Sequence, residues 1–442
     1  MEIRFARAED TGDIAGLWCE AFPGRRTAAD RARMLETGGR YGGLETVLVA
    51  RDGNGRLAGA CKIYRMTQHL AGAALPMMGL AAVAVAPYAR RQGLGATLCG
   101  AALDEARARG DVLSTLYPFR PSYYERLGWG LVGRLLRHRF RTDSLPAYAE
   151  AGDVRPARFP ADAEAIVACY GRVARRSNGP LARDRRIWAY RLAGEELGVR
   201  PLDEEAAFEG RTGRNRFAVF DRGGVAGYAI LRHAPARSPA DGVIHVRELI
   251  AETEGAYRGL LGHLAAQRDQ WPLGLHFARP EERFGDRLED PRPPRYRASR
   301  SLYFPTATRV HGPMLRVLDA RGALAARPLF PGGEPDPRTL VLVVDDPQMP
   351  ANAGPWRVVT TAGGSAAPEV VEPLPAAAPT PDARLETDAP TFARILAGEI
   401  APTAANRLGR ARIEEGRAGG AAGEVLDRAF ATAEAFWLLD EF

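Results

Sequence analysis

The chain of 442 residues contains one lysine, Lys62, and four scattered cysteines, none of them in a Cys-x-x-Cys pair. The seven histidines are not spaced as metal ligands either, so the sequence predicts neither a zinc site nor a disulfide framework, and we expect no metal. No Gly-Lys-Ser/Thr phosphate loop is possible around this one lysine. No apolar run approaches the roughly 18 residues needed to cross a membrane, and we expect a cytoplasmic protein.

Charge of one sign is also not concentrated anywhere in the chain. The 60 basic residues are interleaved with 54 acidic ones, which leaves a net charge of +6. Because no dense basic run appears, neither a nucleic acid nor a membrane surface is predicted as a partner. The hydrophobic content of 46% is that of a globular protein, and the length predicts about three domains.

Residues 79–110 are the most informative stretch. Residues 80–86 form a continuous apolar run that Pro87 ends, which predicts a buried strand. From Leu94 onward, apolar residues recur at helical spacing until Gly110, which predicts a helix. The basic turn between strand and helix is therefore placed at a helix N-terminus.

That turn has the chemistry of an anion site. The first helical turn leaves unpaired N–H groups and a partial positive charge, and Gly93 and Gly95 let a phosphate approach without an intervening Cβ. Arg90 and Arg91 add full charge, which favours a pyrophosphate. The two glycines alone would also fit an ordinary surface turn. A dinucleotide-binding fingerprint does not fit, because it needs glycine at position 98, where this sequence has leucine.

Val83-x-Val85-x-Pro87 followed by Arg90-x-x-Gly93-x-Gly95 resembles the acetyl-CoA-binding motif of the GNAT acyltransferases. The resemblance implies that this strand splays from its neighbour and that acetyl-CoA is the acetyl donor. Residues implied to hold the pantetheine arm are Val83, Ala84 and Val85. Those implied to cradle the pyrophosphate are Arg91, Gln92, Gly93, Leu94, Gly95 and Ala96. Contact with the cofactor arm is also implied for Phe119 and Arg120, with a strand end and a surface arginine as an equally open alternative.

A second motif follows the predicted strand at residues 112–119. Tyr-x-x-x-Gly-aromatic, from Tyr124 through Gly128 to Trp129, again resembles the GNAT pattern, in which this tyrosine protonates the departing thiolate. A phenol has a reference pKa near 10 and can serve as a general acid at neutral pH. The alternative is that Tyr123 and Tyr124 are core or rim aromatics; only Tyr124 fits the spacing.

The predicted elements up to residue 150 follow the GNAT order β-α-α-β-β-β-α. Residues 151–304 partly repeat that order without an Arg-x-x-Gly-x-Gly turn, and Glu252 and Glu254 would repel a pyrophosphate there. We therefore predict a degenerate second GNAT-like domain. Residues 305–442, with strands predicted at 314–318 and 340–345 and a helix capped by Asp388, resemble a sterol carrier protein-like domain.

This three-part order resembles the enhanced intracellular survival (Eis) family of N-acetyltransferases. The predicted fold class is α/β (α+β), with domains at residues 1–150, 151–304 and 305–442. The resemblance implies a hexamer that acetylates amines of polycationic small molecules, typically aminoglycosides. It also implies a sterol carrier shape without sterol traffic.

Acetyl transfer to an amine is helped by a general base, and residues 80–84 contain no aspartate or glutamate that could serve as one. The family resemblance implies that the α-carboxylate of Phe442 takes the proton, and the apolar ending around Trp437 suits a fixed tail. Asp440 and Glu441 could attract a polycation. The sequence leaves two placements possible for Trp18, Phe22 and Tyr64: they line an acceptor pocket, or they pack in the core.

The sequence thus predicts an acetyl-CoA-dependent N-acetyltransferase with Tyr124 as acid and the Phe442 carboxylate as base. Two alternatives stay open. One is a ligand carrier built on the C-terminal domain with a vestigial acyltransferase part, although the intact Gly93 and Gly95 argue against it. The other is a protein lysine acetyltransferase.

Overall fold

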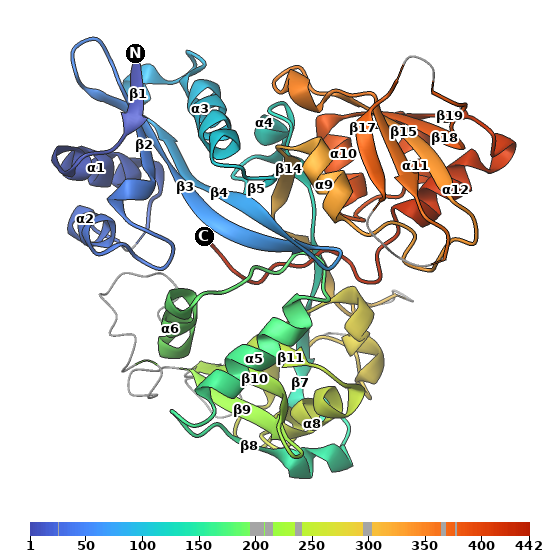
Figure 1. Cartoon of the computed structure of the whole chain (residues 1–442). Coiled ribbons are helices and arrows are strands. Elements are labelled where there is room, and N and C mark those ends of the chain that lie inside the picture. The colour runs from blue at the N-terminus through green and yellow to red at the C-terminus, as the bar shows by residue number, and fades with distance from the viewer. Residues whose placement is uncertain are drawn as a thin grey trace.

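The computed structural model describes residues 1–24, 26–194, 207, 215–234, 241–294, 303–363, 368–375 and 378–442. These residues form two seven-stranded sheets and one five-stranded sheet, each covered by helices, in three lobes (Figure 1). The lobes follow one another roughly in chain order, but the strands are not divided among them in strict chain order.

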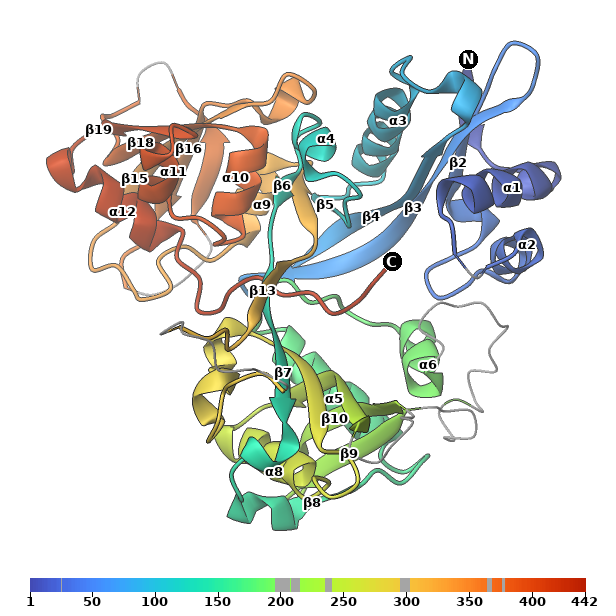
Figure 2. The same cartoon turned by 180° about the vertical axis from the view of Figure 1, so that it is seen from behind.

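The first sheet has the strand order β1-β2-β3-β4-β5-β14-β6. Its strands are β1 (Glu2–Phe5), β2 (Val47–Arg51), β3 (Leu57–Leu70), β4 (Ala73–Val85), β5 (Leu113–Leu116), β14 (Met314–Val317) and β6 (Gly130–Leu131). Helices α1 (Thr11–Ala21) and α2 (Ala28–Thr37) cover one face and α3 (Leu94–Ala108) the other (Figure 2). Alternation along β2 explains this, because Val47 and Val49 pack under α1 while Leu48 and Ala50 pack under α3.

A gap in the hydrogen-bonding ladder opens between β4 and β5. The two strands are parallel and pair from Met77 to Leu80 opposite Leu113 to Leu116, where β5 ends. Because β4 continues to Val85, residues 81–85 have no strand beside them on that side in the described structure. A register shift at the same place puts Ala82 at φ +50°, and Trp18 holds the kink by donating from Nε1 to the Ala82 carbonyl at 2.9 Å. The strand therefore splays as the family resemblance implied.

The second sheet has the order β13-β7-β12-β11-β10-β9-β8. Its strands are β13 (Thr308–His311), β7 (Arg134–Arg141), β12 (Leu273–Ala278), β11 (Val243–Ala251), β10 (Val225–Ala234), β9 (Arg216–Asp221) and β8 (Val154–Pro156). Helices α5 (Ala163–Ala174) and α6 (Arg185–Ala193) pack on one face and α8 (Glu254–Ala265) on the other. The expected strand, turn and helix are present, but Thr253 caps α8 with its own side chain.

The boundaries at residues 150 and 304 do not coincide with the limits of the sheets. β7 lies before residue 150 but belongs to the second sheet, where it pairs with β12 and β13. β14 was expected in the third unit, yet it inserts between β5 and β6 of the first sheet, with Met314 opposite Leu116. The insertion buries every residue of β14. Such long-range pairing is decided by burial that a local pattern does not reveal.

The third sheet has the order β17-β16-β15-β18-β19. It consists of β17 (Val370–Pro373), β16 (Trp356–Thr360), β15 (Arg338–Asp345), β18 (Ala383–Asp388) and β19 (Ala411–Glu415), and it packs with α9 (Ala320–Ala326), α10 (Ala389–Leu396), α11 (Pro402–Arg407) and α12 (Ala422–Ala429). Asp388 caps α10, as predicted, by accepting from the Thr391 N–H at 2.8 Å.

After α12 the chain leaves this lobe and runs back between the other two, so that its C-terminal end lies beside β3 and β4 (Figures 1 and 2). The returning segment is buried from Ala435 to Leu438. Within the described ranges, no helix combines the length and the apolar character needed to cross a bilayer.

Candidate active site

The turn before α3 presents a row of free N–H groups. Gly93 is the N-cap residue at φ +83°, and Arg91 also has a positive φ of +61°. The carbonyl of Gly93 accepts from the Ala96 and Thr97 N–H groups, whereas no acceptor in the described structure meets the N–H groups of residues 91–95. Arg91, Gln92 and Gly93 are exposed. The turn is therefore an open concave donor surface of the kind that binds phosphate groups.

The unpaired edge of β4 leads directly into this turn. The side chains of Val83 and Val85 pack toward α3, while Ala84 packs toward α1. Arg90 donates from Nε to the Val85 carbonyl at 3.0 Å, which ties the start of the turn to the end of the strand. The edge and the turn thus form one continuous backbone surface that runs from Val83 to Ala96.

Tyr123 lies against the turn. A Cβ added to Gly95 would stand 2.5 Å from the Tyr123 hydroxyl oxygen and 3.7 Å from a methyl carbon of Val85. Any larger residue at position 95 would therefore push the tyrosine away or close the approach to the helix N-terminus. Burial raises the pKa of Tyr123 to about 12, so its hydroxyl stays protonated.

Tyr124, in the short helix α4 (Pro121–Glu125), is 4% exposed and packs edge-on against Tyr123 and Trp129, with ring centroids 5.0 and 6.1 Å away. Gly128, at φ +91°, ends this turn as expected. Burial raises the pKa of Tyr124 well above its usual value. Its hydroxyl has no hydrogen-bond partner among the described residues, which leaves the proton free for a ligand.

Phe119 and Arg120 lie beside these tyrosines. Phe119 is 71% exposed, although its ring centroid lies 5.7 Å from those of both Tyr123 and Tyr124. Arg120 is exposed as well. An exposed aromatic ring that extends a buried aromatic cluster provides apolar surface for a ligand lying along the β4 edge.

Phe442 lies on the other side of β4, in the wall of a cavity of about 600 Å³. Its ring packs against Tyr41, Tyr64 and Tyr117, and a Cβ on Gly79 would come within 3.1 Å of it. The cavity lies between α1, α2 and the sheet and is lined by Trp18, Phe22, Pro23, Gly24, Arg26, Arg31, Met34, Lys62, Tyr64, Ala81, Ala82 and Phe442. Since Ala81 and Ala82 begin the unpaired stretch of β4, the cavity opens at the splayed edge.

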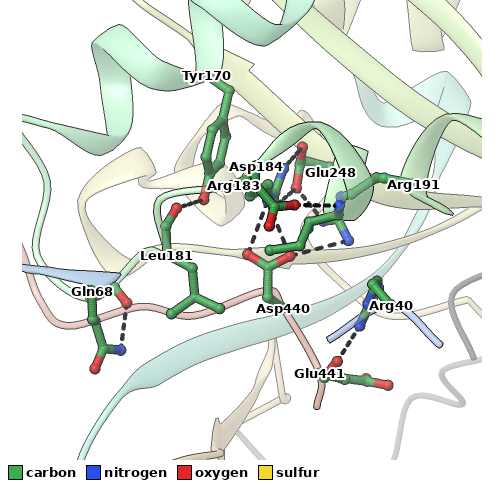
Figure 3. Close-up of polar contacts among 12 residues, drawn as sticks. Arg40, Gln68, Tyr170, Leu181, Arg183, Asp184, Arg191, Glu248, Asp440 and Glu441 are labelled. Carbon is green, nitrogen blue, oxygen red and sulfur yellow. Dashed lines mark hydrogen bonds and ion pairs between the residues drawn. The ribbon is translucent and has the colours of Figure 1, made fainter. Parts of the chain in front are cut away.

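An ion-pair network withdrawn from solvent holds the segment that ends in Phe442 (Figure 3). Arg183 donates from Nε to both carboxylate oxygens of Asp440, at 3.0 and 3.1 Å, and from its terminal nitrogens to Glu248 at 2.7 and 2.9 Å. Arg191 also binds Glu248. The Tyr117 hydroxyl donates to the Asp440 carbonyl at 2.9 Å, and Arg40 donates to the carbonyl of Glu441. The tail is thus tied to both of the first two lobes.

Two expectations need correction or addition here. Asp440 cannot attract a polycation from solvent, because its side chain is 1% exposed and already neutralised by Arg183. Sequence reasoning missed the cationic wall formed by Arg26, Arg31 and Lys62, for which no local motif gives a signal. The aromatic residues left open, Trp18, Phe22 and Tyr64, do line the cavity. Within the described residues, no cluster of histidine, cysteine or acidic side chains could hold a metal ion.

Comparisons with known proteins agree with this architecture. A family profile described as an acetyltransferase (GNAT) domain matches residues 2–132, a second GNAT profile matches residues 179–317, and a sterol carrier protein domain profile matches residues 320–439. An uncharacterized N-acetyltransferase of Streptomyces coelicolor is 29% identical over 310 residues, which cover 68% of each chain. The chain is therefore an acetyltransferase of the GNAT class.

Solved structures extend the similarity to the whole chain. The GCN5-related N-acetyltransferase of Kribbella flavida matches 100% of this chain and 98% of its own, with a TM-score of 0.74 at 22% identity. Eis1 of Mycobacterium abscessus matches 100% of both chains, with a TM-score of 0.74 at 20% identity. The chain thus has the fold of an Eis-like multidomain GNAT protein, with two GNAT domains and a sterol carrier protein-like domain, which confirms the predicted fold class.

Proposed function

We propose that the protein transfers the acetyl group of acetyl-CoA to the nitrogen of an amine. The observation that carries this proposal is the continuity of three features: the free N–H groups of residues 91–95, the unpaired edge at 81–85, and the cavity that opens at Ala81 and Ala82. In this proposal the free N–H groups bind the pyrophosphate, and the unpaired edge of β4 binds the pantetheine arm. The thioester at the end of that arm then reaches the mouth of the cavity, where an acceptor amine can meet it.

Tyr124 supplies the acid in this proposal. The amine nitrogen attacks the thioester carbonyl carbon, the new N–C bond forms and the C–S bond breaks. The Tyr124 hydroxyl protonates the departing thiolate, for which its free proton and raised pKa are suited. Direct transfer requires no acyl-enzyme, and the buried cysteines Cys61 and Cys99, whose thiol pKa values are raised by burial, are poor nucleophiles.

The α-carboxylate of Phe442 is proposed as the base that takes the proton lost by the amine. The side chain of Phe442 lines the cavity, and the buried network around Asp440 fixes the chain two residues before it. A carboxylate held there costs little further ordering when the substrate binds. Tyr124 and this carboxylate approach the reacting atoms from the two faces of β4, which keeps acid and base apart.

The acceptor itself is a separate question. Polycationic aminoglycosides are the amines that the family resemblance implies, and kanamycin therefore belongs in any substrate panel. The same resemblance implies a hexamer, which sedimentation velocity would test. Protein lysine residues are a second class of acceptor for the same chemistry, and the 600 Å³ cavity favours a small amine over a folded protein.

The test combines binding with turnover. Calorimetry should show saturable binding of acetyl-CoA to the full chain, and thiol release should follow when amines of different charge and shape are added. A ligand carrier with a vestigial acyltransferase part would ignore acetyl-CoA. Absence of both binding and thiol release would overturn the proposed function.

A further inference from the structure

The cavity that ends at Phe442 contains an unpaired buried ammonium group. Lys62, on β3, is 6% exposed, and within the described structure no hydrogen bond or ion pair reaches its Nζ. The Nζ lies 5.5 Å from the ring centroids of both Trp18 and Tyr64. Burial lowers the pKa of Lys62 to about 8, so the side chain is mostly charged at neutral pH. A buried charge without a partner is costly and becomes favourable when an anion arrives.

Two arginines strengthen the positive character of the same wall. Arg31, on α2, donates to the Phe22 carbonyl at 2.8 Å, while its Nε is buried without a partner. Arg26 precedes α2, and burial together with the charge of Arg31 lowers its pKa, so the two guanidinium groups repel each other. No described salt bridge neutralises either of them, and each has hydrogen-bonding capacity left for a ligand.

Acidic groups near this wall are few. No aspartate or glutamate side chain lines the cavity. Asp30 lies outside it and is bound to Thr27 in the cap of α2, and Glu45 accepts from the Gly43 N–H. The α-carboxylate of Phe442 forms no ion pair with Arg26, Arg31 or Lys62 among the described contacts. Within the cavity lining, three cations therefore face at most one carboxylate, while Glu45 and Asp30 act on Lys62 and Arg26 from outside that lining.

The remaining walls are apolar. The large apolar side chains of the lining are Trp18, Phe22, Met34, Tyr64 and Phe442, and a flat ring fits between such side chains. The cavity thus offers an apolar body with a cationic patch. A polycation such as kanamycin would have to bring several positive charges into it, which is electrostatically unfavourable.

We infer that the acceptor is a small amine with an apolar or aromatic body and a carboxylate, which Lys62 binds together with Arg26 and Arg31. This inference rests on the proposed function and narrows its substrate class. The carboxylate anchors the acceptor against β3 and α2, and the amine then points to the mouth of the cavity at Ala81 and Ala82. Charge thereby selects an amino acid-like acceptor and disfavours a polyamine.

A matched pair of amines isolates the carboxylate. The acid 4-(aminomethyl)benzoate and its amide, 4-(aminomethyl)benzamide, have nearly the same shape and differ in charge, and the 3-substituted pair moves the charge by one ring position. We expect kcat/KM for at least one acid to exceed that of its amide by about tenfold or more, and to exceed that of kanamycin. An amide or kanamycin as the better substrate in every comparison would overturn the inference and leave the proposed function standing.

The variant Lys62→Met removes the buried charge and keeps the length of the side chain. It should bring the ratio of kcat/KM for acid and amide toward one, whereas Arg33→Met, which replaces an exposed arginine of helix α2 outside the cavity lining, should leave the ratio unchanged. Thermal denaturation checks that both variants fold. An unchanged ratio in Lys62→Met contradicts the assignment of this lysine.

Failure of the proposed function is separated by direct binding. If no amine releases thiol, calorimetry of the acid against the amide with the unmodified chain still measures whether the cavity selects an anion. If the unmodified chain binds the acid more tightly than the amide and Lys62→Met does not, the anion site is supported even though the transfer reaction is overturned. Equal binding of the acid and the amide, together with the absence of thiol release, would overturn the anion site as well as the transfer reaction.

Discussion

Arg183 and Asp440 form an ion pair withdrawn from solvent, with Nε 3.0 Å from Oδ2 and side chains 0% and 1% exposed. The two residues are far apart in the chain, and the pair joins the C-terminal segment to the second lobe. Glu248 shares Arg183; burial alone would raise the pKa of this glutamate, but the charges and hydrogen bonds of Arg183 and Arg191 outweigh it and lower the pKa. The position of Phe442 therefore depends on charges that lie outside the cavity that Phe442 lines.

The substitution Asp440→Asn tests this dependence. It leaves two arginines facing one carboxylate, and breaking a buried pair costs about 3–5 kcal/mol, part of which is regained if the tail detaches. We expect kcat for amine acetylation to fall at least tenfold with the affinity for acetyl-CoA unchanged. Glu424→Gln, which changes an exposed acid on α12, is the control. Full activity in Asp440→Asn would show that the tail needs no such anchor.

Gly95→Ala should weaken acetyl-CoA binding at small cost in stability. The added Cβ meets the Tyr123 hydroxyl at 2.5 Å and stands on the approach to the free N–H groups. Gly100→Ala on the same helix is the matched control: nothing lies within 4 Å of its Cβ position, and alanine should stabilise the helix by about 0.5–1 kcal/mol. Calorimetry with acetyl-CoA separates the two variants. Equal affinity of the two variants for acetyl-CoA would show that the turn takes no part in binding acetyl-CoA.

Tyr124→Phe should lower kcat by about 10²–10⁴-fold and leave acetyl-CoA binding intact, because only the proton of the general acid is lost. Tyr123→Phe is the informative comparison, since the neighbouring hydroxyl faces Gly95 and is not assigned the proton. Stopped-flow measurement of thiol release gives kcat for each. A larger loss of kcat in Tyr123→Phe than in Tyr124→Phe would assign the role of general acid to Tyr123.

The extent to which these features were predictable depends on how local their signals are. Pro87, Gly93 and Gly110 are local stop and cap signals, and they predicted the end of β4 and both ends of α3 within a residue or two, whereas the start of β4 at Ala73 lies seven residues before the predicted one. Asp388 at the start of α10 is a signal of the same kind. These elements need only the chemistry of neighbouring residues, so the sequence was sufficient for them.

Long-range pairing was not predictable in the same way. β14 reads as an ordinary apolar strand of the third unit, and only the unfilled edge of β5 draws it into the first sheet. Lys62 and Arg31 are separated by 31 positions on different elements, so their meeting in one cavity depends on how α2 packs on α1 and α1 on the sheet. The burial of Asp440 depends likewise on two arginines of the second lobe.

Gly128→Ala should destabilise the protein strongly. A Cβ there would stand 1.1 Å from Nη1 of Arg316, whose side chain is fully buried and paired with Asp346 at 2.8 Å. We expect a loss of about 3 kcal/mol or more in the free energy of unfolding. Gly110→Ala, with a similar φ of +83° and nothing within 4 Å, should cost only about 1 kcal/mol. Urea denaturation measures both, and similar losses would mean that backbone strain alone sets the cost.

The buried charge of Lys62 makes a pH-dependent contribution to stability. Its pKa in the folded protein is lowered to about 8, while the unfolded chain keeps a value near 10.4. Between these values the unfolded state binds more protons, so the free energy of unfolding contributed by this residue rises as the pH increases from about 8 to about 10. Below pH 8 the lysine is charged in both states, and its burial penalty is fully present.

The difference between the parent chain and Lys62→Met isolates this contribution from that of buried tyrosines such as Tyr64, whose raised pKa values act in the opposite direction above pH 10. Lys62→Met should therefore be the more stable chain at pH 7, and its advantage should shrink toward pH 10. Urea denaturation of both chains at several pH values measures the trend. An advantage that stays constant with pH would show that Lys62 carries no buried charge, and the anion site would lose its main cation.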